Sequence, residues 1–131
     1  MSVAHRLPDA CVADFQRDGF LPSLPVLPAD EVAELRRRVD HIREELAELE
    51  PRLYEVEAAW SSRPDQNVCH FLGGWQVDPV LHDLVFDPRV TVPAAQLLGV
   101  SRLRFWHDQV FFKPPHHPGV VPWHQDYSYW T

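Results

Sequence analysis

The clearest pattern in the chain is a stripe of apolar residues at helical spacing. After Pro28 the apolar side chains recur at alternating steps of three and four, at Val32, Leu35, Val39, Ile42, Leu46 and Leu49. This period places them on one face of an amphipathic helix. The stripe is shorter than the roughly three to four heptads of a coiled coil, and a proline at position 51 interrupts it. We therefore expect the helix to pack against a sheet of the same protein.

A shorter helix is predicted near the N-terminus. Residues 9–18 have helical character, Asp9 suits the N-cap, and Gly19 can end the helix in the left-handed conformation. The next residues, 20–27, contain two prolines and are expected to be extended.

The middle of the chain is expected to be a loop followed by two short helices. Residues 61–77 carry helix breakers and a pair of glycines, which is typical of a long loop. Helices are predicted at 79–86 and 93–98, each with proline in its first turn, and Gly99 ends the second.

The last thirty residues change character. Residues 102–113 are rich in aromatic and β-branched side chains and lack proline and glycine, which indicates a strand, and extended character resumes at 121–130 after a proline-rich loop. Helices followed by strands indicate an α+β fold. Two strands cannot bury enough surface alone, so we expect 101–131 to be the opening of a sheet whose remainder is absent.

Composition narrows the class of protein. A length of 131 residues fits one domain, 1–131. The net charge of −7 and pI of about 5.5 disfavour nucleic-acid binding. Cys11 and Cys69 lack CxxC spacing and are expected to be buried or half-buried thiols of a cytoplasmic protein. We find no signal-peptide or membrane-span pattern and therefore expect no membrane partner.

His124 and Asp126 are the strongest candidates for chemistry. The five glycines fit neither a phosphate-binding loop nor a nucleophile elbow. In a strand, residues i and i+2 share a face, so an imidazole and a carboxylate would lie side by side. Together they form two-thirds of the two-His-one-carboxylate set that holds non-haem Fe(II). By spacing alone, a simple His–Asp hydrogen bond on a sheet surface remains the alternative.

The surrounding residues resemble a known family. The pair lies in WHQDYSYW, with HDQVFFKPP shortly before it, and the opening FQRDGFLPSLPVLPADEVAELRRRVD has a helix ending in DGF followed by an acidic helix. In these segments the chain resembles the phytanoyl-CoA dioxygenase family of Fe(II)- and 2-oxoglutarate-dependent oxygenases. The resemblance implies a double-stranded β-helix (a jelly-roll type of sheet pair) with metal at one end, and the use of O₂ to hydroxylate a small organic substrate.

The same resemblance implies roles for individual residues. His124 and Asp126 match the first two iron ligands, and Lys113 falls where the co-substrate carboxylate is expected, although an ordinary strand-end lysine is the alternative. Asp108 and Gln109 match a recurrent DQ with a supporting hydrogen-bonding role. The aromatic candidates for the substrate side, which could equally be core residues, are Trp123, Tyr127, Tyr129 and Trp130.

The family's third ligand, a distal histidine, and its 2-oxoglutarate-binding arginine come more than a hundred residues later than this motif. We therefore expect the chain to be the N-terminal part of such an enzyme and inactive alone. His116 and His117 could supply a ligand locally, but a proline-rich loop favours solvent exposure. The alternative is a truncated, non-catalytic relative that self-associates through its acidic helix and open sheet edge.

Overall fold

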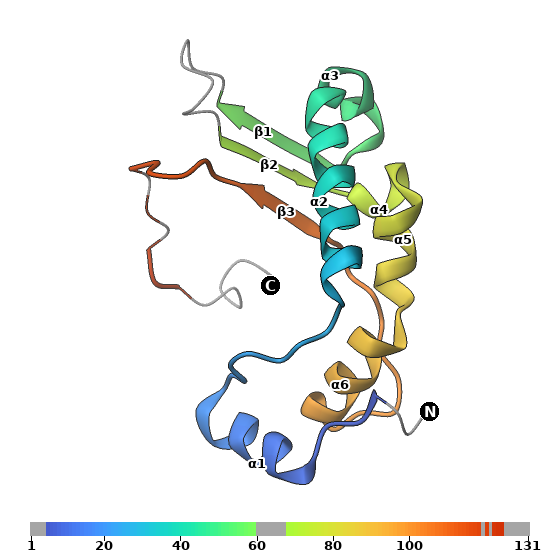
Figure 1. The fold of residues 1–131 in the computed structure, drawn as a ribbon, viewed down its shortest axis with the longest axis vertical. Coiled ribbons are helices and arrows are strands. Elements are labelled where there is room, and N and C mark those ends of the chain that lie inside the picture. The colour runs from blue at the N-terminus through green and yellow to red at the C-terminus, as the bar shows by residue number, and fades with distance from the viewer. Residues whose placement is uncertain (1–4, 60–67, 119, 121, 125–131) are drawn as a thin grey trace.

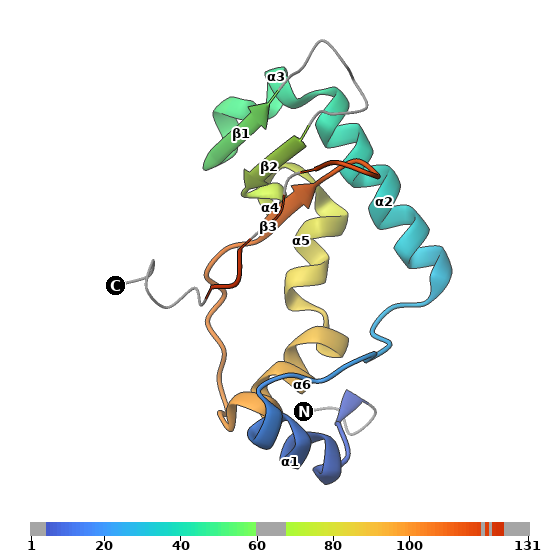
Figure 2. The same cartoon turned by 90° about the vertical axis from the view of Figure 1, so that its left-hand side faces the viewer.

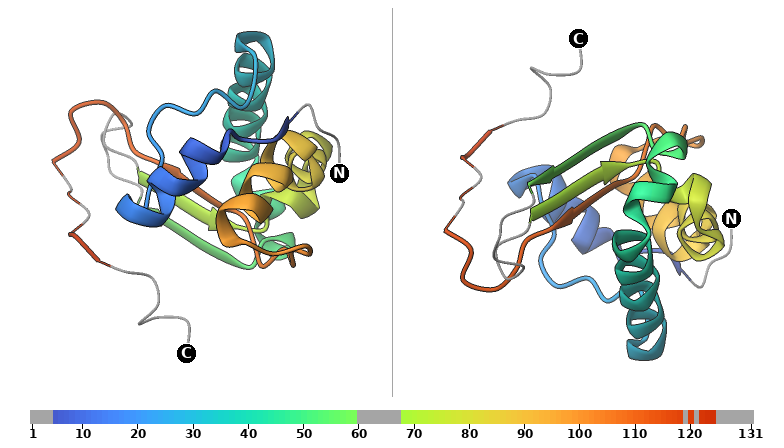
Figure 3. Two further views of the ribbon diagram at one scale, coloured as in Figure 1. Left: turned by 90° about the horizontal axis from the view of Figure 1, so that it is seen from below. Right: turned by 90° about the horizontal axis from the view of Figure 1, so that it is seen from above.

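The fold consists of a small antiparallel sheet with helices on one side (Figures 1 and 3). The structure is a computed structural model, and it describes residues 5–59, 68–118, 120 and 122–124. The strands lie in the order β1-β2-β3, with β1 at Glu55–Ala59, β2 at Val68–Leu72 and β3 at Gln109–Phe112. Val56 pairs with Phe71, which pairs on its other side with Val110.

The helices form two groups. Figures 1 and 2 show α2 and α5 beside the sheet, and α1 and α6 together at the far end of the molecule. The helical elements in chain order are α1 (Asp9–Asp18), α2 (Ala29–Glu44), α3 (Leu46–Leu49), the 3₁₀ turn η2 (Glu50–Arg52), α4 (Gly74–Val77), α5 (Pro79–Phe86) and α6 (Pro88–Leu98). None of the helices in the described ranges is both long and apolar enough to cross a membrane.

The core lies between β2 and the C-terminal half of the apolar stripe. Cys69 and Phe71 alternate with their neighbours on β2 and point to the helix side, where they meet Ile42 and Leu46. Phe71 and Ile42 are fully buried, at 0% and 1% exposure, and each such side chain contributes roughly 1.5–3 kcal/mol. The expected packing of the stripe against the protein's own sheet is thus confirmed.

The helix predictions hold in position but need three corrections. Pro8, rather than Asp9, is the N-cap of α1, while Gly19 ends the helix at φ +81° as expected. The striped helix is interrupted at Glu45 before α3 continues the stripe. The helix predicted at 93–98 begins at Pro88, because the Asp87 carboxylate caps it by accepting from the Arg89 amide.

The strand predictions were wrong in two places. The segment predicted as a loop, 61–77, contains β2 and α4, so strands precede the last two helices instead of following all of them. The strand predicted at 102–113 is confined to β3. Gln109 is paired with Leu72, the last residue of β2, so the residues before it have no partner on which to form a ladder.

The proline-rich loop is confirmed and the last predicted strand is untested. His117 N donates to Pro114 O within a turn. Residues 122–124 have no regular secondary structure, and residues 125–131 lie outside the described part. The shared strand face of His124 and Asp126 therefore remains a prediction. Cys11 is half-buried and Cys69 buried, as expected.

Candidate functional site

The sheet has one face packed on the helices and one face that no described helix or strand covers (Figure 3). Because side chains alternate along a strand, and Val56, Phe71 and Val110 belong to the core face, their neighbours belong to the other. This open face carries Glu55 of β1, His70 and Leu72 of β2, and Gln109 and Phe111 of β3.

A histidine, an amide and an aromatic ring are linked on the open face. His70 and Phe111 are cross-strand partners, and their rings stack with centroids 4.4 Å apart and planes 14° apart. Gln109 Nε2 lies 2.8 Å from His70 Nε2. An amide nitrogen only donates, so His70 Nε2 accepts and the ring proton lies on Nδ1. Gln109, one of the predicted residues, thus orients His70, which sequence reasoning missed.

Asp108 binds the backbone where β2 ends and α4 begins. Its Oδ1 accepts from the Gly73 amide at 2.9 Å, and its Oδ2 accepts from the Trp75 amide at 2.8 Å. Gly74 leaves room for this contact, since a Cβ at that position would lie 2.9 Å from Asp108 Oδ2. The carboxylate of Asp108 is therefore engaged in backbone hydrogen bonds that join the start of β3 to α4, and its supporting role at a metal site stays a prediction.

Lys113 directly follows β3. It is exposed, and it lies two residues after Phe111 and four after Gln109, both on the open face. Lys113 lies one residue beyond the strand, and continued alternation would put it on that same face. An ammonium group at this position can bind a carboxylate.

The His124 ring is hydrogen-bonded to a backbone carbonyl. Its Nδ1 lies 2.8 Å from the Pro122 carbonyl oxygen. Since a carbonyl only accepts, the Nδ1–H group of His124 donates in this bond. Ligating histidines commonly donate their other N–H to such a group. Trp123 is fully exposed. The other candidates of this motif lie outside the described residues: Asp126, Tyr127, Tyr129 and Trp130.

A complete metal centre is not assembled within the described ranges. No three His, Cys, Asp or Glu residues among those described are grouped closely enough to hold an ion. His116 is exposed and has φ +61°, and His117 is half-buried, so the exposure expected for this loop holds for the first only. Burial raises the pKa of the Cys69 thiol, which disfavours a nucleophilic thiolate there.

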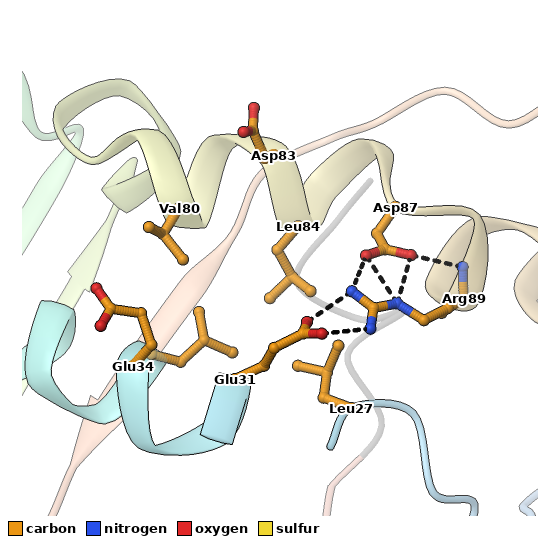
Figure 4. A pocket seen from close by; sticks show the side chains of 9 residues that line it. Leu27, Glu31, Glu34, Val80, Asp83, Leu84, Asp87 and Arg89 are labelled. Carbon is orange, nitrogen blue, oxygen red and sulfur yellow. Dashed lines mark hydrogen bonds and ion pairs between the residues drawn. The ribbon is translucent and has the colours of Figure 1, made fainter. Parts of the chain in front are cut away.

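A cavity of about 190 Å³ lies between α2 and α5, away from these candidates (Figure 4). At its edge the Arg89 guanidinium binds Glu31 with two hydrogen bonds, of 2.8 and 2.7 Å, and also binds Asp87. Hydrogen bonding to Arg89 lowers the pKa of Asp87, and Glu31 followed by Asp87 raises the pKa of Arg89. Glu31 and Asp87 are thus occupied by Arg89, and the Glu31–Arg89 pair joins α2 to α6.

A second hollow lies between α2 and β3. It has a volume of about 470 Å³ and is mostly apolar, with lining residues Val32, Leu35, Arg36, Val39, Asp40, Val110, Phe111 and Phe112. The N-terminal half of the apolar stripe faces this groove, which explains why Val32 is 37% exposed while Ile42 is buried.

Comparisons with known proteins agree with the resemblance of the two end segments. The family model described as "Phytanoyl-CoA dioxygenase (PhyH)" matches residues 15–131. The match confirms the resemblance that the DGF helix and the WHQD segment indicate.

Two curated relatives are enzymes by name. The chain is 34% identical over 131 residues to L-proline trans-4-hydroxylase of Streptomyces griseoviridis, covering 99% of this chain and 44% of that protein. It is 28% identical over 119 residues to ectoine dioxygenase of Bordetella bronchiseptica, covering 91% of this chain and 37% of that protein. The chain thus spans less than half the length of either relative. No solved structure matches it.

Proposed function

The chain belongs to the phytanoyl-CoA dioxygenase family, and we propose that it is the N-terminal part of an Fe(II)- and 2-oxoglutarate-dependent hydroxylase. The observation that carries the proposal is the family match over residues 15–131, which includes the WHQD motif. The hydrogen bond from His124 Nδ1 to Pro122 O is of the kind that ligating histidines make. The names of both relatives, a hydroxylase and a dioxygenase, support the same class of reaction.

In this proposal His124 and Asp126 hold the iron, and a third ligand comes from elsewhere. The bound metal would supply O₂ activation, with 2-oxoglutarate converted to succinate and CO₂ while a C–H bond of the substrate is hydroxylated. The residues of this chain bind and orient the reactants. Lys113 binds a carboxylate of 2-oxoglutarate, while Asp108 keeps the start of β3 in place through its bonds to the α4 loop.

The proposal also assigns the open sheet to a larger fold. We take β1, β2 and β3 as opening strands of a double-stranded β-helix within a single domain, 1–131, whose open face becomes the barrel interior. Candidates for the substrate side of that interior are Trp123, Tyr127, Tyr129 and Trp130. L-proline, the substrate named in one relative, is the first small molecule to test.

The alternative, a non-catalytic association module, gains no support from the comparisons, since both relatives are named as enzymes. The acidic face of α2 is in part occupied within the fold, because Glu31 binds Arg89. We therefore favour the enzymatic proposal.

The test uses the longest gene product that contains these 131 residues. With Fe(II), ascorbate, 2-oxoglutarate and L-proline, we expect succinate formation that His124→Ala and Asp126→Ala abolish. The same variants should weaken Co(II) binding, followed by its visible absorption. The matched control is His82→Ala, since His82 is a half-exposed histidine on α5. Unchanged succinate formation and metal binding in both ligand variants would refute the assignment.

A further inference from the structure

The open face of the sheet contains a histidine that lies outside the iron motif and whose ring is contacted by two neighbouring side chains. His70 lies at the centre of the three strands and is half-buried. Its ring is fixed on two sides, by Phe111 stacked at 4.4 Å and by the Gln109 amide at 2.8 Å. An imidazole that served only as a solvated surface group would need neither contact.

The two contacts determine what His70 can offer a ligand. Because Nε2 accepts from Gln109, the remaining ring nitrogen, Nδ1, carries a proton and donates. Its partner must therefore be an acceptor, and a charged carboxylate is a strong one. The stacking on Phe111 fixes the ring plane and with it the direction of the Nδ1–H bond.

The position of His70 relates it to the other candidate groups. Gln109 and Phe111 are on the strand that leads directly to Lys113. Two carboxylate-binding groups on one face, an ammonium at the strand end and an imidazole further inside, suit two different carboxylates. In the proposed reaction these belong to 2-oxoglutarate and to the organic substrate.

We propose that His70, oriented by Gln109 and Phe111, is a specificity-determining residue that binds a carboxylate of the organic substrate through Nδ1–H. This inference rests on the proposed function, because it assumes that the open face contains the reaction site. It adds a substrate class, small molecules with a free carboxylate.

The experiment compares L-proline with L-prolinamide, which lacks the carboxylate, on the same gene product used above. We expect the wild type to bind L-proline about tenfold more tightly than the amide, the value of one charge-assisted hydrogen bond. His70→Phe, which keeps the aromatic stacking, should abolish that preference. His82→Phe is the matched control and should keep it, since His82 lies on α5.

Two further measurements separate this inference from the proposed function. Nitrogen-15 shifts of the His70 ring should show the Nδ1–H tautomer in the wild type and a mixture in Gln109→Leu. Titration with 2-oxoglutarate should be unaffected by His70→Phe. Loss of 2-oxoglutarate affinity, an Nε2–H tautomer, or no preference for L-proline in the wild type would each overturn the assignment. Co(II) binding at His124 would be intact in all these cases, whereas its absence would instead count against the proposed function.

Discussion

Removal of the Asp108 carboxylate should destabilise the fold by more than removal of an exposed carboxylate. The two oxygens accept from the Gly73 and Trp75 amides at 2.9 and 2.8 Å. A hydrogen bond to a charged group contributes about 1.5–3 kcal/mol, and an amide left without a partner in a buried position costs about 1–3 kcal/mol. Gly73 is buried while Asp108 is half-buried. We therefore expect Asp108→Ala to lower the free energy of unfolding by about 2–4 kcal/mol.

Asp108→Asn is the more informative variant, because it preserves shape. Its oxygen can still accept from one amide, but its NH₂ group then faces the other amide, and two donors repel. The expected loss is about 1–3 kcal/mol, smaller than for alanine. Gly74→Ala tests the same contact from the other side, since the added Cβ would lie 2.9 Å from Asp108 Oδ2 and 3.0 Å from Leu81 Cδ1.

Urea unfolding followed by circular dichroism measures these differences. With a slope of about 2 kcal/mol per molar urea, the alanine variant should unfold at a midpoint lower by about 1–2 M. Asp83→Ala is the matched control, because the Asp83 side chain is 86% exposed, and it should change the midpoint by less than about 0.3 M. An unchanged midpoint in Asp108→Ala would refute the view that this carboxylate fastens β3 to α4.

Three other outcomes follow from the structure. Because the folded-state pKa of Asp87 is lowered by Arg89, its contribution is present above the unfolded pKa near 4 and is lost as the pH falls through the folded value. Asp87→Asn should therefore show a smaller drop in urea midpoint between pH 5 and pH 2.5 than the wild type, and an equal drop would contradict this. Gly19→Ala should cost about 1 kcal/mol through backbone strain alone, since φ is +81° and no atom lies within 4 Å of the added Cβ; a Tm equal to wild type would exclude strain. Lys113→Met should raise the KM for 2-oxoglutarate severalfold without changing Co(II) affinity, and an unchanged KM would leave Lys113 a solvated strand-end charge.

The helices could be predicted because their signals are local. Asp78 accepts from the Val80 and Leu81 amides beside Pro79, so cap and first turn are adjacent in sequence, and α5 has the predicted bounds 79–86. Pro93 misled the prediction of α6 because proline is commonest in a first turn, whereas here it lies inside the helix.

The strands were harder to predict because they depend on distant partners. The sequence of β1, EVEAA, has two acids among five residues and becomes a strand only by pairing with β2. The predicted strand at 102–113 is shortened for the same reason, since β2 ends at Leu72.

Some residues of the candidate site could likewise be predicted from neighbouring residues in the sequence, whereas others depend on distant ones. His124 and Lys113 are recognisable from the motifs around them. His70 has no motif, and its role depends on the register that sets it opposite Phe111, 41 positions later. An alternating VCHFL segment could have indicated a strand, but only the pairing shows that Gln109 reaches the histidine.

The connections of β2 have a consequence for how the chain acquires this shape. Residues 60–67 join β1 to β2, whereas residues 73–108, which include α5 and α6, separate β2 from β3. Loop-closure entropy makes the second pairing about 1.3 kcal/mol more costly than the first. During synthesis the β1–β2 hairpin can therefore form early, while β3 joins after the two helices have emerged and docked. A nascent chain whose α6 has emerged from the ribosome, but whose β3 has not, should thus have formed helices and a sheet that still lacks one strand.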